Sequence, residues 1–349
     1  MERAPPECAA RPGARALRAL GVFWLVLLLA GLSGALWLDR LGPPEPAVAG
    51  TEAEAAEGVA PLSQAESQRA AGPDGVAPRP PLIAAPDPAL LEPLRDGALP
   101  RVADDGRAPW RSYARAFDET DRRPRIGLLV AGLGISESAT EAAIQRLPGA
   151  VSLAFSPYGL KLAEFAAMAR ADGHEVLVAI PMEPVGFPLN DPGPQALLTS
   201  RAWAENSQRL AWALSRFSGY VGATNALGPS LRGERFSASP EAMRPVLEVL
   251  RARGLMYVEA RPGEAAPKGL PARAVDLVID DRPSRAEIEQ RLGDLERLAR
   301  ERGSALGLSG AGAIAIERIA EWAARVEQRG FALAPVSALV LPPERQAQR

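Results

Sequence analysis

The chain has 349 residues, enough for one or two domains with a sizeable hydrophobic core. Its 40 basic and 42 acidic residues give a formal charge of -2, so the basic surface of a nucleic-acid-binding protein is not expected. The single histidine, His174, and the single cysteine, Cys8, exclude zinc fingers, disulfide scaffolds and every site that needs two imidazoles.

The N-terminal part has the pattern of a membrane anchor. Residues 19–38 form an uncharged, apolar run, and a helix of about 20 residues spans the hydrocarbon core of a bilayer. Arginines in residues 1–18 predict a cytoplasmic N-terminus, with the remainder across a bacterial inner membrane in the periplasm. A cleaved signal peptide is the alternative, but its apolar core is about 7–15 residues long and ends in small residues rather than Trp37.

Residues 39–110 differ in composition from the rest of the chain. They are rich in Ala, Pro, Gly and Glu, and their apolar periodicity is weak. We interpret them as a mostly disordered linker, of which 86–105 can contact the following domain. Trp110 and Tyr113 are the predicted docking residues. The folded domain is expected over 122–342, with 343–349 as a tail.

From Arg125 onward, short apolar runs alternate with stretches of helical spacing. The predicted strands are 126–130, 151–155, 175–180, 220–224, 255–259, 274–279, 305–308 and 331–336. Continuous apolar strands with helices between them indicate a parallel sheet covered on its faces. The sequence therefore predicts an α/β fold, a (β/α) barrel of seven or eight strands that is either complete or incomplete.

Helix starts are marked by polar residues. Ser138 with Glu141 and Ser284 with Glu287 have the spacing of capping boxes, and Ser239 precedes a proline suited to a first helical turn. Periodic apolar residues support two of these helices, over 243–250 and 288–295. A further buried helix face is expected from Trp203, Leu210 and Leu214.

In barrels of this kind the chemistry lies where strands end and loops begin. The polar residues at the predicted strand ends are the candidate ligand-binding residues: Glu183, Asn225, Glu259, Arg261, Asp280 and Asp281. His174 comes before its strand, so we expect it to be structural or on the surface rather than catalytic. A structural interpretation is also open for the candidates, as solvated Glu259–Arg261 and Asp280–Arg282 ion pairs and a loop cap.

Several stretches in order, 147–155, 173–177 and 180–184, resemble the divergent polysaccharide deacetylase family over about residues 125–341. The resemblance implies a barrel with a divalent metal held by Asp and His. The metal would activate a water that attacks an acetyl group on a sugar. It therefore links the protein to carbohydrate metabolism in the cell envelope.

The sequence departs from the family pattern at the residues that would hold the metal. Two aspartates of the family correspond to Ala131 and Gly132, and two histidines correspond to Ala226 and Gly310. Methyl groups and hydrogens do not bind a hard cation. We therefore expect a catalytically degenerate barrel with no confident catalytic residue, no metal and no cofactor.

The predicted function is binding of an envelope polysaccharide or a periplasmic protein at the former active-site mouth. One alternative is a working metal-dependent carbohydrate N- or O-deacetylase in which Glu183, Glu259 and Asp280 hold a divalent metal. A second alternative is a structural envelope scaffold in which the mouth has no role.

Overall fold

The computed structural model describes Trp24 and residues 85–340. Apart from Trp24, the predicted cytoplasmic segment 1–18, the anchor 19–38, the linker portion 39–84 and the tail 343–349 lie outside the described residues. Within the described part, no helix is long and apolar enough to cross a membrane. The chain divides into units 1–75 and 76–349, and every element below belongs to the second unit.

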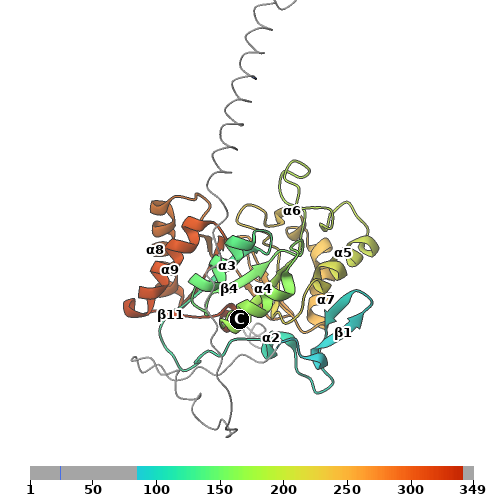
Figure 1. Cartoon of the computed structure of the whole chain (residues 1–349), viewed down its shortest axis with the longest axis horizontal. Helices are drawn as coiled ribbons and strands as arrows, with labels where there is room; N and C mark the ends of the chain where they lie inside the picture. The colour runs from blue at the N-terminus through green and yellow to red at the C-terminus, as the bar shows by residue number, and fades with distance from the viewer. Residues whose placement is uncertain (1–23, 25–84, 341–349) are drawn as a thin grey trace, which may run out of the picture. The chain divides into compact units, whose positions relative to one another are not determined.

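The second unit is built on a parallel sheet with helices packed around it (Figure 1). Its strands are β3 (Arg125–Leu133), β4 (Ser152–Phe155), β5 (Val176–Ala179), β6 (Gly222–Thr224), β7 (Met256–Glu259), β8 (Ala272–Ala274), β9 (Leu277–Val278), β10 (Ser304–Gly310) and β11 (Ala332–Leu333). The order is β8-β7-β6-β5-β4-β3-β10-β9, with β11 beside the start of β3, and all these neighbours are parallel. The α/β barrel prediction is confirmed, in its incomplete form, because β8 and β9 do not pair with each other.

The two edge strands of the sheet are consecutive in the chain. β8 pairs with β7 and β9 pairs with β10, and only Val275 and Asp276 lie between them. The Val275 amide donates to the Glu259 carbonyl (2.9 Å) and the Asp276 amide donates to the Leu306 carbonyl (2.8 Å). The single strand expected over 274–279 is therefore divided, because the chain crosses here from one edge of the sheet to the other.

The helices of this unit follow the strands along the chain. They are α3 (Glu137–Arg146), α4 (Leu162–Ala171), α5 (Trp203–Ser215), α6 (Glu234–Ser237), α7 (Pro240–Ala252), α8 (Arg285–Arg302) and α9 (Ala313–Val326), followed by the 3-10 helices η3 (Glu327–Arg329) and η4 (Val336–Leu339). Ser239 caps α7 and Ser284 caps α8, as predicted, each accepting a backbone N–H of the first turn.

Two details of the helix prediction are wrong. α3 is capped by Ser136 rather than Ser138, because Thr140 Oγ1 donates to the Ser136 carbonyl (2.6 Å) and accepts the Gly134 amide (2.9 Å), which closes the first turn earlier. Trp203 is 38% exposed, because it is the first residue of α5 and lies at the end of the helix rather than along its buried face.

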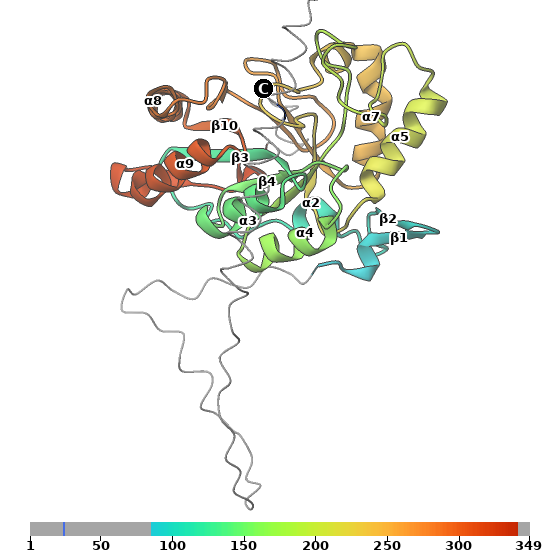
Figure 2. The ribbon, with the colours of Figure 1, turned by 45° about the horizontal axis from the view of Figure 1, so that its top comes forward.

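The sheet separates two apolar clusters. Alternate strand residues such as Val130 and Tyr257 belong to the cluster that lies between the sheet and the helices. Figure 2 shows these helices around the sheet. Their neighbours Leu129 and Val258 belong to a smaller cluster on the opposite, inner face of the sheet. That inner cluster includes residues of η4, so the last helical turn fills the interior of the incomplete barrel.

The end of the segment 39–110, predicted to be a mostly disordered linker, is folded in the part that the structure describes, and the contacts expected for 86–105, Trp110 and Tyr113 are present. Residues 88–112 contain a 3-10 helix η2 (Pro88–Leu90), a hairpin of β1 (Leu91–Leu94) and β2 (Gly97–Pro100), and α2 (Pro109–Ser112). Leu90 is fully buried and Tyr113 is 1% exposed, and both belong to the inner cluster. The Tyr113 hydroxyl accepts the Asp87 amide (2.9 Å). This segment is ordered by tertiary burial, which composition alone does not reveal.

Candidate functional site

The positions that correspond to metal ligands in the resembled family lie together at the ends of β3, β6 and β10. Ala131 and Ala226 are fully buried in the inner cluster. A Cβ placed on Gly132 would lie 3.1 Å from the Leu227 carbonyl oxygen, and a Cβ on Gly310 would lie 2.8 Å from Pro229 Cδ. The loop after β6 therefore occupies the space into which larger side chains at these positions would extend.

Asp280 lies beside these positions and is already engaged. Its carboxylate accepts the Gly310 amide at 3.1 and 3.0 Å, and its Oδ2 would be 3.1 Å from a Cβ on Gly310. Burial raises the pKa of the Asp280 carboxyl, and the Gly310 amide opposes that rise. The expected Asp280–Arg282 ion pair is absent from the described residues, because Asp280 turns inward to the β10 backbone.

Asn225 and Glu259 form a second set, at the ends of β6 and β7. Asn225 Nδ2 donates to Glu259 Oε1 (2.9 Å) and to the Arg232 carbonyl (2.7 Å), and Asn225 Oδ1 accepts the Ala260 amide (2.8 Å). Arg261 Nε donates to Glu259 Oε1 (3.1 Å). The Glu259–Arg261 ion pair exists as expected, but it is not solvated, since the Glu259 side chain is 3% exposed and the Arg261 side chain 19% exposed.

Glu183 belongs to a third set, after β5. Its Oε2 accepts both the amide and the hydroxyl of Thr199 at 2.7 Å, and its Oε1 lies 3.2 Å from Arg235 Nε. Its backbone carbonyl accepts the amides of Arg235 and Phe236 in α6. Glu183 therefore ties the long loop 183–199 to α6.

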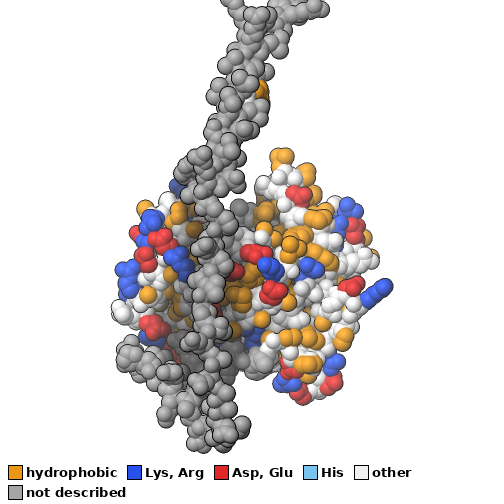
Figure 3. Space-filling model, viewed as in Figure 1, with side chains coloured by type: hydrophobic (Ala, Val, Ile, Leu, Met, Phe, Trp, Pro, Cys, Tyr) orange, Lys and Arg blue, Asp and Glu red, His pale blue; other side chains and the backbone are white. Residues whose placement is uncertain are grey.

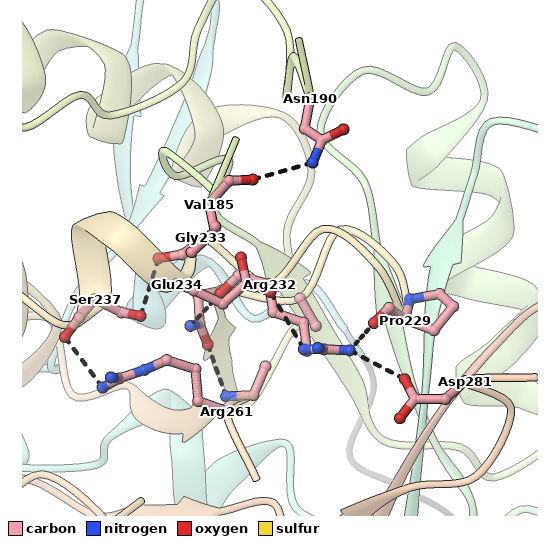
Figure 4. Close-up of polar contacts among 12 residues, drawn as sticks. Val185, Asn190, Pro229, Arg232, Gly233, Glu234, Ser237, Arg261 and Asp281 are labelled. Atoms are coloured by element: carbon pink, nitrogen blue, oxygen red, sulfur yellow. Dashed lines mark hydrogen bonds and ion pairs between the residues drawn. The ribbon is translucent and has the colours of Figure 1, made fainter. Parts of the chain in front are cut away.

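Asp281, in contrast, is half exposed and contacts the loop after β6 rather than the loop 183–199. Its Oδ1 lies 3.4 Å from Arg232 Nη1, and Arg232 Nη1 also donates to the Pro229 carbonyl (Figure 4). Arg232 Nε lies 3.4 Å from Glu234. Asp281 is thus connected to Asn225 through Arg232, whose carbonyl Asn225 binds.

The segment 232–237 joins these sets, although it contains none of the predicted site residues. The Arg232 guanidinium contacts Asp281, and the Arg232 carbonyl accepts a hydrogen bond from Asn225. Backbone amides of α6 donate to the Glu183 carbonyl. The Ser237 carbonyl accepts a hydrogen bond from Arg261 Nη2 (3.2 Å, Figure 4). The density of charged residues in 232–235 was the available signal. Of the six candidates, five are linked through this segment, and Asp280 is bound elsewhere.

His174 is part of the core, in the structural role predicted. It is fully buried, and its ring nitrogens lie 2.7 Å from the Val151 carbonyl oxygen and 3.0 Å from the Ile144 carbonyl oxygen. It comes before β5, at the end of the sheet opposite the candidates.

A metal of the kind the family resemblance implies needs several oxygen or nitrogen ligands. Ala131, Gly132, Ala226 and Gly310 offer no side-chain donor. Within residues 85–340 no group of three His, Cys, Asp or Glu side chains is placed to hold a metal ion. Glu183, Glu259 and Asp280 are held by different partners: Thr199, Asn225 and the Gly310 amide. The residues present do not fit such a metal.

Comparisons with known proteins identify the family. The family model described as divergent polysaccharide deacetylase matches residues 128–340. The chain belongs to this family. An uncharacterized protein of Agrobacterium tumefaciens has a crystal structure similar to this chain, with 34% identity, a TM-score of 0.65, and coverage of 70% of this chain and 100% of that one.

A second solved structure is more distant. It is titled a putative cellobiose-phosphate cleavage protein of Enterococcus faecalis, with 12% identity and a TM-score of 0.43, covering 63% of this chain and 100% of that one. No curated protein matches the chain. The family assignment therefore depends on the family model and on the Agrobacterium relative.

Proposed function

We propose that this member of the family does not carry out metal-dependent deacetylation and instead binds a polysaccharide of the cell envelope. The observation that carries the proposal is the replacement of the implied ligands by Ala131, Gly132, Ala226 and Gly310, packed against the loop after β6. The envelope location follows from the predicted anchor at 19–38. We keep the predicted periplasmic orientation of the barrel as part of the proposal.

The alternative of a rebuilt metal site receives less support from the geometry. Glu183 is held by Thr199 and Arg235, and Glu259 is held by Asn225 and Arg261. Binding a cation would require each carboxylate to exchange these partners for the metal, at a cost in hydrogen bonds and ion pairs.

An activity assay on the full-length protein tests the loss of catalysis. The protein is incubated with acetylated chitin and xylan oligosaccharides and with Zn²⁺, Co²⁺ or Mg²⁺, and released acetate is measured beside an active metal-dependent deacetylase. We expect no acetate above the enzyme-free level and no bound metal by elemental analysis. Metal-dependent release that is lost in Asp280→Asn and retained in the neighbouring Asp281→Asn would overturn the proposal.

A binding assay separates polysaccharide binding from a purely structural role. The structure shows that Glu183 and Asn225 are buried and hold several segments, so their alanine variants would perturb folding as well as any site. Exposed residues of a defined cavity are the better test, and one such cavity adjoins Glu259 and Arg261.

A further inference from the structure

A cavity of about 530 Å³ lies between α7 and the segment that follows β7. Arg244, Leu247 and Arg251 line it from α7, and Lys268 lines it from the opposite segment. The Glu259–Arg261 pair lies at its edge. The volume is in the range of pockets that bind small ligands.

The charge of this cavity differs from that of the chain. The chain has a formal charge of -2, and on the face seen in Figure 3 acidic and basic side chains are interspersed. The cavity is lined by four basic and two acidic side chains, and one basic residue, Arg261, is already paired with Glu259. Glu248 is the other acidic residue, and it lies between Arg244 and Arg251 along α7.

The remaining basic residues, Arg244, Arg251 and Lys268, are exposed at this cavity. None of Arg244, Arg251 and Lys268 makes an ion pair with another residue of the described part, 85–340. Elsewhere the arginines commonly do: Arg318 contacts three carboxylates and Arg297 contacts two. These three cations outnumber Glu248, the one carboxylate of the cavity outside the Glu259–Arg261 pair, so the cavity favours an anionic ligand.

The apolar lining restricts what carries that anion. Exposed Pro240 and half-buried Leu247 and Pro267 present apolar surface to the cavity, over the buried side chains of Met243 and Leu270. A free phosphate would fill only a small part of the volume and would make no use of the apolar lining. A sugar ring has an apolar C–H face and a polar edge, so a carboxylate-bearing sugar matches both parts of the lining.

We infer that this cavity binds the uronate units of an acidic polysaccharide. The carboxylates would lie among Arg244, Arg251 and Lys268, and the ring faces would pack on the apolar residues. The inference rests on the proposed polysaccharide-binding function and specifies its ligand class and place. The site lies beside β7, separate from the degenerate positions at Ala131, Ala226 and Gly310.

Titration calorimetry on the full-length protein at low ionic strength tests the inference. The probes are an oligogalacturonate, a neutral galacto-oligosaccharide of equal length, and inorganic phosphate. We expect the oligogalacturonate to bind more tightly than either other probe, with an affinity that falls as salt is added. The double variant Arg244→Gln/Lys268→Gln should weaken that binding about tenfold.

A charge-matched control is Arg95→Gln/Arg122→Gln, which removes two exposed arginines away from the cavity. If both double variants weaken oligogalacturonate binding equally, the loss results from the change in net charge rather than from this cavity, and the inference is overturned. Equal affinity for the neutral oligosaccharide would overturn it but leave polysaccharide binding intact. Equal affinity for phosphate would show an anion site without a sugar site. Binding of neither oligosaccharide would overturn both proposals, whereas acetate release would overturn only the loss of catalysis.

Discussion

Asn225 holds the Glu259 carboxylate in a fixed position at the end of β7. One amide N–H donates to Glu259 Oε1 at 2.9 Å and the other donates to the Arg232 carbonyl at 2.7 Å, while the amide oxygen accepts the Ala260 N–H at 2.8 Å. A single buried amide therefore connects two strand ends and the loop after β6. The Asn225 amide, which carries no charge, also hydrogen-bonds the Glu259 carboxylate, whose ion-pair partner is Arg261.

Replacement of Asn225 by alanine should lower the free energy of unfolding by about 3 kcal/mol, because it leaves a buried carboxylate, an N–H and a carbonyl without this partner. Asn190→Ala is the matched control, since the exposed Asn190 side chain makes one hydrogen bond, to the Val185 carbonyl (3.0 Å). Its expected cost is below about 0.5 kcal/mol. Urea denaturation measures both, and similar losses in the two variants would contradict the role assigned to Asn225.

Gly310→Ala tests how closely the loop after β6 packs against β10. The new methyl group would lie 2.8 Å from Pro229 Cδ and 3.1 Å from Asp280 Oδ2, so we expect a loss of about 1–3 kcal/mol in the free energy of unfolding. Gly293→Ala provides the opposite case, because that exposed helical glycine has no atom within 4 Å of an added Cβ. It should gain about 0.5–1 kcal/mol. If Gly310→Ala leaves the free energy of unfolding unchanged in thermal and urea denaturation, the loop after β6 is free to move away from the new methyl group.

The sequence predicted those features that local pattern determines. The apolar run 126–130 is within β3, and the Ser239 and Ser284 caps begin α7 and α8, because strand burial and helix capping depend on neighbouring residues. The secondary structure of the Pro-rich segment around Leu90 does not follow from its composition, since its order depends on burial against β-strands distant in the chain. The same limit applies to the site: Asn225 and Glu259 were identified from strand ends, but their link through Arg232 and Ser237 depends on tertiary packing.

His174 should give the protein a pH dependence of stability with a defined sign. Burial lowers the pKa of the imidazole below its usual value of about 6.5, although the Val151 and Ile144 carbonyls oppose this shift. Between the lowered pKa and 6.5 the unfolded chain binds more protons, so stability should fall as the pH drops below about 6.5. As the chain contains one histidine, its imidazole resonance reports the pKa directly by NMR. His174→Gln should reduce the pH slope of unfolding, and an unchanged slope would contradict the assignment.

Glu175 connects three distant parts of the chain at the start of β5. Its Oε1 accepts the Arg115 amide (2.9 Å), and its Oε2 accepts the Ser337 amide (3.1 Å) and the Ser152 hydroxyl (3.3 Å). The Ser337 hydroxyl donates to Oε1 as well. The carboxyl is fully buried, and burial raises its pKa above the usual value despite these donors.

Because its pKa is raised on folding, Glu175 binds more protons in the folded chain than in the unfolded chain above the usual carboxyl pKa. Its contribution to stability is therefore complete at lower pH and declines as the pH rises toward the folded-state pKa. Glu175→Gln does not titrate, so the stability advantage of the wild type over this variant should shrink between pH 4 and pH 7. Glu141→Gln, at an exposed position of α3, should show no such trend. Urea unfolding across this range measures both differences, and an advantage that grows with pH would mean that the Glu175 hydrogen bonds outweigh its burial.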